Sequence, residues 1–175
     1  KSSEKMDYEK AAILRDRIKA LTQIQSSQNI SSTNLDNADV ISVAQEAGKT
    51  CVQVFFYRSK QNWGNQSYFP SHDKSHTAEE VLTSFIAQFY ENKSVPAEIL
   101  LNKKIKDLNL IKSALEKKEK KLISIKIPSK GNDLKLSKMA EKNAKESLTR
   151  KIFESETNNK LLDEVADKFK LDISP

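Results

Sequence analysis

The chain has 175 residues, 37% of them hydrophobic and 31% charged, with a net charge of +6 and a pI near 9.2. This length and composition suit one domain with a small appendage, and the single cysteine, Cys51, excludes an intramolecular disulfide. No apolar run is long enough to cross a bilayer and no signal-peptide pattern is present, which predicts a cytoplasmic protein.

An amphipathic helix is predicted over residues 8–24. Ala11, Leu14, Ile18 and Leu21 recur at spacings of three and four and form one apolar face. The polar residues that follow are rich in Ser, Asn and Gln and indicate a linker. We therefore divide the chain into a helical motif at 1–25, a linker at 26–37, a central domain at 38–155 and a helical connector at 156–175.

Three strands are predicted next. Apolar and β-branched runs over 40–44 and 50–58 indicate two antiparallel strands joined by a turn at 46–49. The turn-forming run before a third strand at 66–69 is Asn62-Trp63-Gly64-Asn65. Cys51 lies in the second apolar run, where we expect a small buried side chain and not a reactive thiol.

Helices and strands alternate after residue 70. Thr77 is placed to cap a helix whose first turn carries Glu79 and Glu80. Strands are predicted at 98–101 and 121–127, with a helix at 107–118 between them and two helices, at 134–153 and 158–169, after them. A three-stranded meander followed by this alternation is the element order of an RNase H-like domain. The expected fold is therefore α/β, with a mixed sheet, flanking helices and right-handed crossovers.

Carboxylates are sparse where such a domain would need them. Active RNase H-like sites hold two divalent metal ions among several carboxylates, typically one of them in the middle of the first strand. The predicted first strand is apolar apart from one serine, Asp39 lies only at its start, and Glu98 is the sole acid near the fourth strand. We therefore expect a catalytically inactive scaffold, with no metal and no cofactor.

Two weaker patterns involve histidine and aromatic residues. His72 and His76 stand four residues apart, but a preceding Pro-Ser pair places them in a loop, so a metal site is not expected. The aromatic residues of the predicted second and third strands are Phe55, Phe56, Tyr57, Trp63, Tyr68 and Phe69. They could stack on bases if exposed, but on long strands a core position for Phe55 and Tyr57, or for Phe56, is favoured.

The positive net charge suits contact with phosphate backbones. Lysines carry most of it, and many stand beside glutamates, a pattern also typical of a solvated helix face. Both a nucleic-acid surface and a purely solubilising charge are therefore compatible with the sequence. The side chains that we predict to meet DNA are Arg58, Lys130, Lys135 and Arg150.

Residues 6–18 resemble the UVR motif of bacterial excision-repair proteins, whose pattern is Phe-Glu-x-Ala-Ala-x-x-Arg-Asp. The matching residues are Glu9, Ala11, Ala12, Arg15 and Asp16, with Tyr8 in the place of the phenylalanine. Further runs at 52–58, 63–70, 82–90, 96–101, 127–131 and 139–144 follow in the order seen in the UvrC family, one of the components of the bacterial ABC excinuclease. The resemblance covers essentially the whole chain.

The resemblance implies a part in nucleotide excision repair, as a subunit that joins the damage-recognition protein UvrB on DNA and supports dual incision. The implied partners are UvrB and damaged DNA, with no membrane and no small-molecule substrate. The implied UvrB-facing residues are Tyr8, Glu9, Ala11, Ala12, Leu14, Arg15, Asp16 and Ile18.

Compared with the family, the chain is expected to begin inside the UVR hairpin and to end before the second nuclease domain, so that neither nuclease centre of the family maps onto it. The alternatives are a stand-alone protein-interaction or nucleic-acid-binding module and an inactive truncated product.

Overall fold

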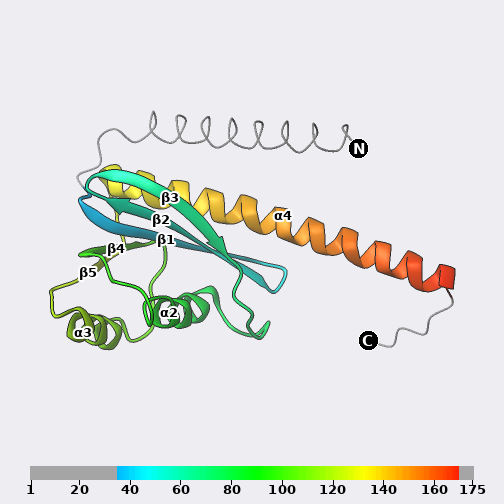
Figure 1. Ribbon diagram of the computed structural model, residues 1–175, viewed down its shortest axis with the longest axis horizontal. Coiled ribbons are helices and arrows are strands. Elements are labelled where there is room, and N and C mark those ends of the chain that lie inside the picture. Colours follow the sequence, from blue (N-terminus) through cyan, green and yellow to red (C-terminus); the bar gives the residue numbers. More distant parts are fainter. Residues whose placement is uncertain (1–34, 170–175) are drawn as a thin grey trace, which may run out of the picture.

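A five-stranded mixed sheet with helices on both faces forms the centre of the computed structural model, which describes residues 35–169 (Figure 1). The strands are β1 (Asn37–Glu46), β2 (Lys49–Arg58), β3 (Gln61–Tyr68), β4 (Glu98–Leu101) and β5 (Ser124–Lys126), and the helices are α2 (Ala78–Phe89), α3 (Leu108–Glu119) and α4 (Gly131–Phe169). The strand order is β3-β2-β1-β4-β5. β1, β2 and β3 pair antiparallel, whereas β4 pairs parallel with β1 and β5 parallel with β4.

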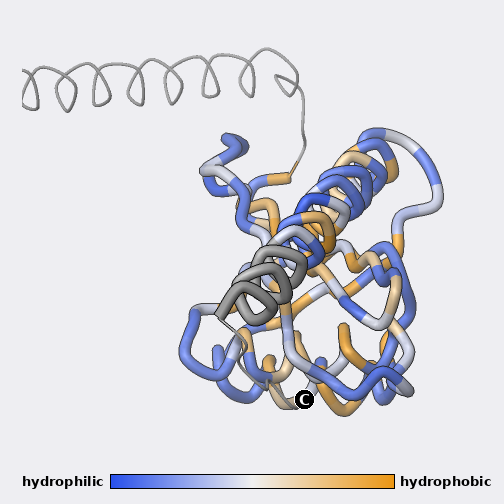
Figure 2. Tube along the Cα trace, turned by 90° about the vertical axis from the view of Figure 1, so that its right-hand side faces the viewer, coloured by the Kyte–Doolittle hydropathy of each residue, from blue (hydrophilic) through white to orange (hydrophobic). Residues whose placement is uncertain are grey.

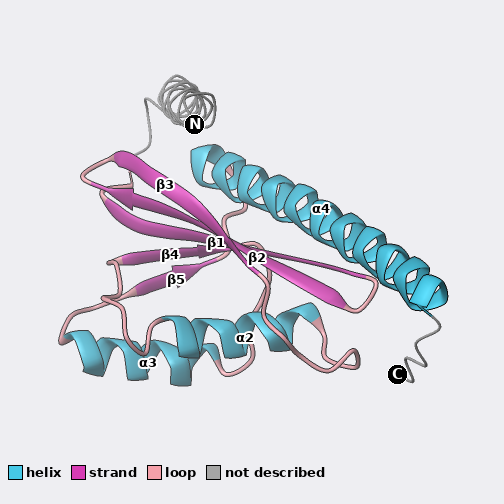
Figure 3. Ribbon diagram, turned by 45° about the vertical axis from the view of Figure 1, so that its right-hand side comes forward, coloured by secondary structure: helices cyan, strands magenta, loops and turns pink. Residues whose placement is uncertain are grey.

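The sheet is buried on both faces because helices cover both sides (Figure 3). Successive side chains of a strand point to opposite faces. Ile41 and Val43 therefore pack toward α2 and α3, whereas Ala38, Val40 and Ala44 pack toward α4. Hydrophobic residues accordingly concentrate on the strands and the inner helix faces, and hydrophilic residues on the outside (Figure 2).

Two-residue turns join the first three strands. Ala47 and Gly48 both have positive φ, at 49° and 70°, which confirms the first predicted turn. Ser59 and Lys60 also have positive φ, at 50° and 63°, as a tight hairpin with primed turn geometry requires. The turn predicted at 62–65 is therefore wrong, since these residues belong to β3. Gly64, with φ of 116°, lies there near a bulge, where it adopts a backbone conformation that other residues avoid.

Helix α2 begins as predicted. The Thr77 hydroxyl accepts a hydrogen bond from the Glu80 N–H at 3.3 Å, and the Glu80 carboxylate accepts one from the Thr77 N–H at 2.9 Å, which forms a capping box. An ion pair with Lys106 at 2.7 Å, together with these bonds, lowers the pKa of Glu80 to about 2. At the other end of α2, the Lys118 Nζ of α3 donates to the backbone carbonyls of Glu91 and Lys93, both at 2.9 Å, and so ties α3 to α2.

Helix α4 is a single helix of 39 residues, so the prediction of two separate helices is wrong. Residues 132–169 contain neither glycine nor proline, and the Thr157 hydroxyl donates to the Phe153 carbonyl at 2.9 Å inside the helix. Its buried stripe packs on β1 and β2 through Leu136, Ala140, Ala144 and Leu148. The small alanines let the helix approach the sheet closely. The C-terminal part of α4 extends past the sheet (Figure 1).

The described residues bear on two of the predicted boundaries. Leu35 is buried in the core and β1 starts at Asn37, so the last residues of the segment assigned to the 26–37 linker lie in the domain. α4 runs continuously across the boundary assigned at 155/156. The motif assigned to 1–25 lies outside the described residues. No helix among the described residues is long and apolar enough to cross a membrane.

Candidate functional site

The middle of β1 is where an RNase H-like nuclease carries its central carboxylate. Here that segment is Ile41-Ser42-Val43, with Ile41 and Val43 in the apolar core. Ser42 is fully buried on the opposite face, and its hydroxyl donates to the Ser137 carbonyl of α4 at 3.1 Å. The serine therefore ties the sheet to α4 and has no charge with which to hold a cation.

The end of β4 adjoins this segment and is followed by an amide side chain. Asn102 Oδ1 accepts a hydrogen bond from the Val43 N–H at 2.9 Å, and Asn102 Nδ2 donates to the Val43 carbonyl at 2.9 Å. The side chain thus continues the hydrogen bonding of the parallel ladder beyond the strand. A carboxylate has no proton to donate to the Val43 carbonyl. Asn102 is therefore suited to a structural bond here and not to ligating a metal ion.

Asp39 is the carboxylate nearest to a nuclease position, and the structure corrects its predicted place. It is the third residue of β1, inside the strand and not at its start, and its side chain is buried. Arg58 Nη1 donates to Asp39 Oδ1 at 2.8 Å, and the Tyr90 hydroxyl donates to Oδ2 at 2.7 Å. Burial raises the pKa of Asp39, and the bonds from Arg58 and Tyr90 oppose that rise. Both carboxylate oxygens are thus committed to protein partners.

The remaining acids do not complete a metal centre. Glu98, the acid near the fourth strand, forms an ion pair with Lys126, which also contacts Asp133 at 3.2 Å. Within the described residues, no three or more His, Cys, Asp or Glu side chains cluster so that they could hold a metal ion. The residues of this sheet therefore do not fit a two-metal nuclease centre.

The two histidines lie in the loop before α2, as predicted. Their ring centroids are 6.5 Å apart. His72 Nδ1 contacts the Asp73 carbonyl at 2.8 Å, so that nitrogen carries the proton, and Nε2 bonds the Thr50 hydroxyl at 2.7 Å. Both ring nitrogens of His72 thus bond protein groups. The two histidines lie on a surface loop.

The four side chains predicted to meet DNA do not share one face. Arg58 is a partner of Asp39 on the α2 side of the sheet, where it also donates to the Ala38 carbonyl at 3.1 Å. Lys135 and Arg150 are exposed on α4, across the sheet. They are 15 positions apart, which corresponds to roughly 22 Å along the helix. Lys130 is exposed just before α4. DNA contact by these residues remains a prediction, and Arg58 is the one that forms an ion pair within the described residues.

The aromatic and cysteine predictions can be compared directly with the structure. Phe55 and Tyr57 are buried against α4, which confirms the first predicted alternative, and Phe56 is partly buried and packs against the core on the opposite face. Phe69, directly after β3, is 43% exposed and Trp63 is 72% exposed, so these two meet the condition stated for stacking on bases. Cys51 is buried as predicted, and burial raises the pKa of its thiol to about 11.

Sequence reasoning missed the partnership of Asp39 with Tyr90. The two residues are 51 positions apart, so no local pattern links them, and only the packing of α2 on β1 brings them together.

The element order, the sheet order and the strand directions define an RNase H-like domain. Comparison with known proteins then places this domain: the chain belongs to the UvrC family. Residues 37–151 match the family described as UvrC Ribonuclease H-like domain, and residues 1–24 match the UvrB/uvrC motif, UVR. The eight residues predicted to face UvrB fall within this second match, outside the described residues.

Curated relatives agree with this family assignment. The chain is 46% identical over 174 residues to the UvrABC system protein C of Ruegeria sp. (strain TM1040), and 43% identical over 175 residues to that of Bartonella quintana (strain Toulouse). The matches cover 99% and 100% of this chain but 27% and 26% of the relatives, so the chain spans about a quarter of their length.

A solved structure from Bacteroides thetaiotaomicron, described as having an actin-like ATPase fold and unknown function, aligns with a TM-score of 0.31 at 13% identity. The alignment covers 66% of this chain and 40% of that one, and this likeness is too low to bear on function.

Proposed function

We propose that this chain is a docking and spacing segment of a UvrC excision-repair protein. Its UVR motif binds UvrB, and its RNase H-like domain supports dual incision of damaged DNA in nucleotide excision repair without cleaving phosphodiester bonds itself. The proposed setting is the bacterial cytoplasm, where UvrB and damaged DNA are the partners. The domain match over residues 37–151 and the motif match over 1–24 support this assignment.

One observation supports the non-catalytic role most strongly. The middle of β1 and the residue directly after the adjoining β4 are Ser42 and Asn102 and not carboxylates, and both side chains form hydrogen bonds to the backbone of neighbouring elements. Asp39, the carboxylate inside β1, is neutralised by Arg58. The arrangement uses its polar groups to join β1, β4 and α4, which suits a rigid scaffold.

Titration of the protein with Mn²⁺ tests this role through the backbone amide signals in an NMR spectrum. A bound paramagnetic ion would broaden the signals around its site. We expect no selective broadening of Val43 and Asn102, because the nearby oxygens are uncharged or already bonded. Exposed carboxylates such as Glu146 provide the control for weak, nonspecific association. Selective loss of the Val43 and Asn102 signals at low Mn²⁺ would contradict the proposal.

A further inference from the structure

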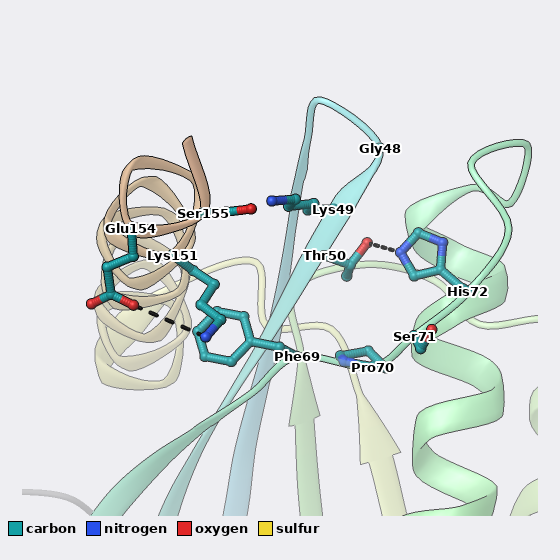
Figure 4. Close-up of a pocket in the computed structure, with 10 residues that line it drawn as sticks. All are labelled: Gly48, Lys49, Thr50, Phe69, Pro70, Ser71, His72, Lys151, Glu154 and Ser155. Carbon is teal, nitrogen blue, oxygen red and sulfur yellow. Dashed lines mark hydrogen bonds and ion pairs between the residues drawn. The ribbon is translucent and has the colours of Figure 1, made fainter. Parts of the chain in front are cut away.

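A groove follows the segment that leaves β3 and leads to α2. Its central hollow has a volume of about 460 Å³ and lies between the β1–β2 hairpin, this segment and α4 (Figure 4). Smaller hollows of about 270 and 320 Å³ adjoin it. One shares Phe69 and Lys151 with the central hollow, and the other shares His72. We call the three together the Phe69 groove.

The free charge of the Phe69 groove is positive. Lys49, Arg150 and Lys151 line it, and Lys49 has no ion pair within the described residues. The two carboxylates of its lining are already engaged: Glu154 with Lys151 at 4.0 Å, and Glu80 with Lys106 at 2.7 Å. An anionic ligand therefore meets cations that are not fully neutralised by the protein.

Neutral hydrogen-bonding groups lie beside these cations. The Thr50 hydroxyl and the His72 ring face the central hollow and bond each other at 2.7 Å, with Ser71 next to them (Figure 4). In the adjoining hollow, Arg150 donates to the Ser147 hydroxyl at 3.3 Å, and the Ser67 hydroxyl is 3.1 Å from that of Ser147. Short polar side chains of this kind commonly contact phosphate and sugar oxygens.

An exposed aromatic ring lines the groove beside these cations. Phe69 lines both the central hollow and the one that contains Arg150, with 43% of its surface exposed. The Lys151 ammonium lies 5.9 Å from the ring centroid. An acidic peptide would use the cations but has no need of the ring. Proteins that bind single-stranded nucleic acid commonly stack bases on aromatic side chains and contact the phosphate backbone with nearby cations.

We infer that the Phe69 groove binds single-stranded DNA, with one base stacked on Phe69 and the flanking phosphates near Lys49 and Arg150. A duplex does not fit this mode because its base faces are stacked inside. The inference rests on the proposed function, since it names the DNA form that this domain would hold during excision repair. The groove would hold unpaired, single-stranded DNA against the RNase H-like domain.

Fluorescence anisotropy of a labelled single-stranded oligothymidylate of about 15 nucleotides tests the inference on the full 175-residue chain. Phe69→Ala should weaken binding about tenfold, because base–aromatic stacking is lost. Phe69→Tyr, which keeps the ring, should bind within about twofold of the original chain. For a duplex of the same length, Phe69→Ala should leave the affinity unchanged, since duplex binding does not use the ring.

A charge-matched pair of double variants tests the cations. Lys49→Gln with Arg150→Gln should weaken single-strand binding. It should also reduce the slope of log affinity against log salt concentration by about 1.4, because each of the two lost phosphate contacts contributes about 0.7. Lys117→Gln with Lys138→Gln removes the same charge from exposed positions outside the groove and should bind like the original chain. Thermal denaturation verifies that each variant is folded. If Phe69→Ala is unfolded, the binding of the Lys49→Gln/Arg150→Gln variant tests the inference by itself.

Equal binding by the original chain, the Phe69→Ala variant and the Lys49→Gln/Arg150→Gln variant would overturn the inference. Displacement of the oligonucleotide by polyglutamate, with no effect of Phe69→Ala, would also overturn it and favour an acidic peptide. Neither result touches UvrB docking, which is measured separately, so failure of the groove and failure of the proposed function are distinguishable.

Discussion

Replacing Asp39 by alanine is expected to lower the free energy of unfolding by about 3 kcal/mol. The change leaves the Arg58 guanidinium without its counter-ion and the buried Tyr90 hydroxyl without an acceptor. Loss of a partner at a fully buried ion pair costs about 3–5 kcal/mol. The lower end applies here because the Arg58 side chain is 27% exposed and water can partly solvate it.

Urea denaturation of the purified chain measures this effect. Asp39→Asn is the matched control: it keeps the shape and one acceptor oxygen for Tyr90 but still removes the counter-ion of Arg58, so we expect an intermediate loss of about 2 kcal/mol. A double-mutant cycle with Arg58→Ala should show coupling between the two positions. An Asp39→Ala chain as stable as the original would mean that this ion pair does not hold β1, β2 and α2 together.

Replacing Ala12 by glutamate is expected to abolish UvrB binding. The UVR motif match covers this position, and two adjacent alanines permit close approach of a partner helix. Glutamate would place an unpaired charge in the packed seam, which costs several kcal/mol and lowers affinity by more than about a hundredfold. Arg15 and Asp16 would form ion pairs at the rim, where they set register more than affinity.

Calorimetry against purified UvrB measures this effect on the 175-residue chain and its Ala12→Glu variant. The control is Ala20→Glu, the same substitution at an alanine that helical spacing places opposite Ala11 and outside the residues predicted to face UvrB, and it should retain most of the affinity. Unchanged affinity in Ala12→Glu would show that this helix is not the docking surface, and the RNase H-like domain would then be the next candidate.

The hydrophobic pattern was enough to predict most of the sheet. β4 lies at the predicted residues, and β2 starts only one residue earlier than predicted. These strands could be predicted because continuous runs of β-branched and apolar residues are typical of strands buried on both faces. The capping residue Thr77 was readable because its partner Glu80 is only three residues away. Local signals of this kind need no knowledge of the tertiary structure.

The errors arose where local signals were weak or misleading. Asn62 and Gly64 are turn formers, yet the chain turns at Ser59–Lys60, where the pairing of β2 with β3 imposes positive φ on ordinary residues. Helix α4 likewise continues through Ser155 and Thr157, which have modest helix propensity, because no glycine or proline interrupts it there. The Phe69 groove was invisible for a related reason, since it joins a hairpin, a loop and a helix that are distant in sequence.

The most direct test of the central claim is a plasmid-nicking assay with the purified chain in Mg²⁺ or Mn²⁺. Supercoiled DNA reports a single cleaved bond, so weak activity is detectable. We predict no nicking above the protein-free control, because the middle of β1 and the end of β4 carry Ser42 and Asn102 and not carboxylates, and Asp39 is held by Arg58 and Tyr90. Metal-dependent nicking that disappears in the Asp39→Asn variant would contradict the account and show a working nuclease.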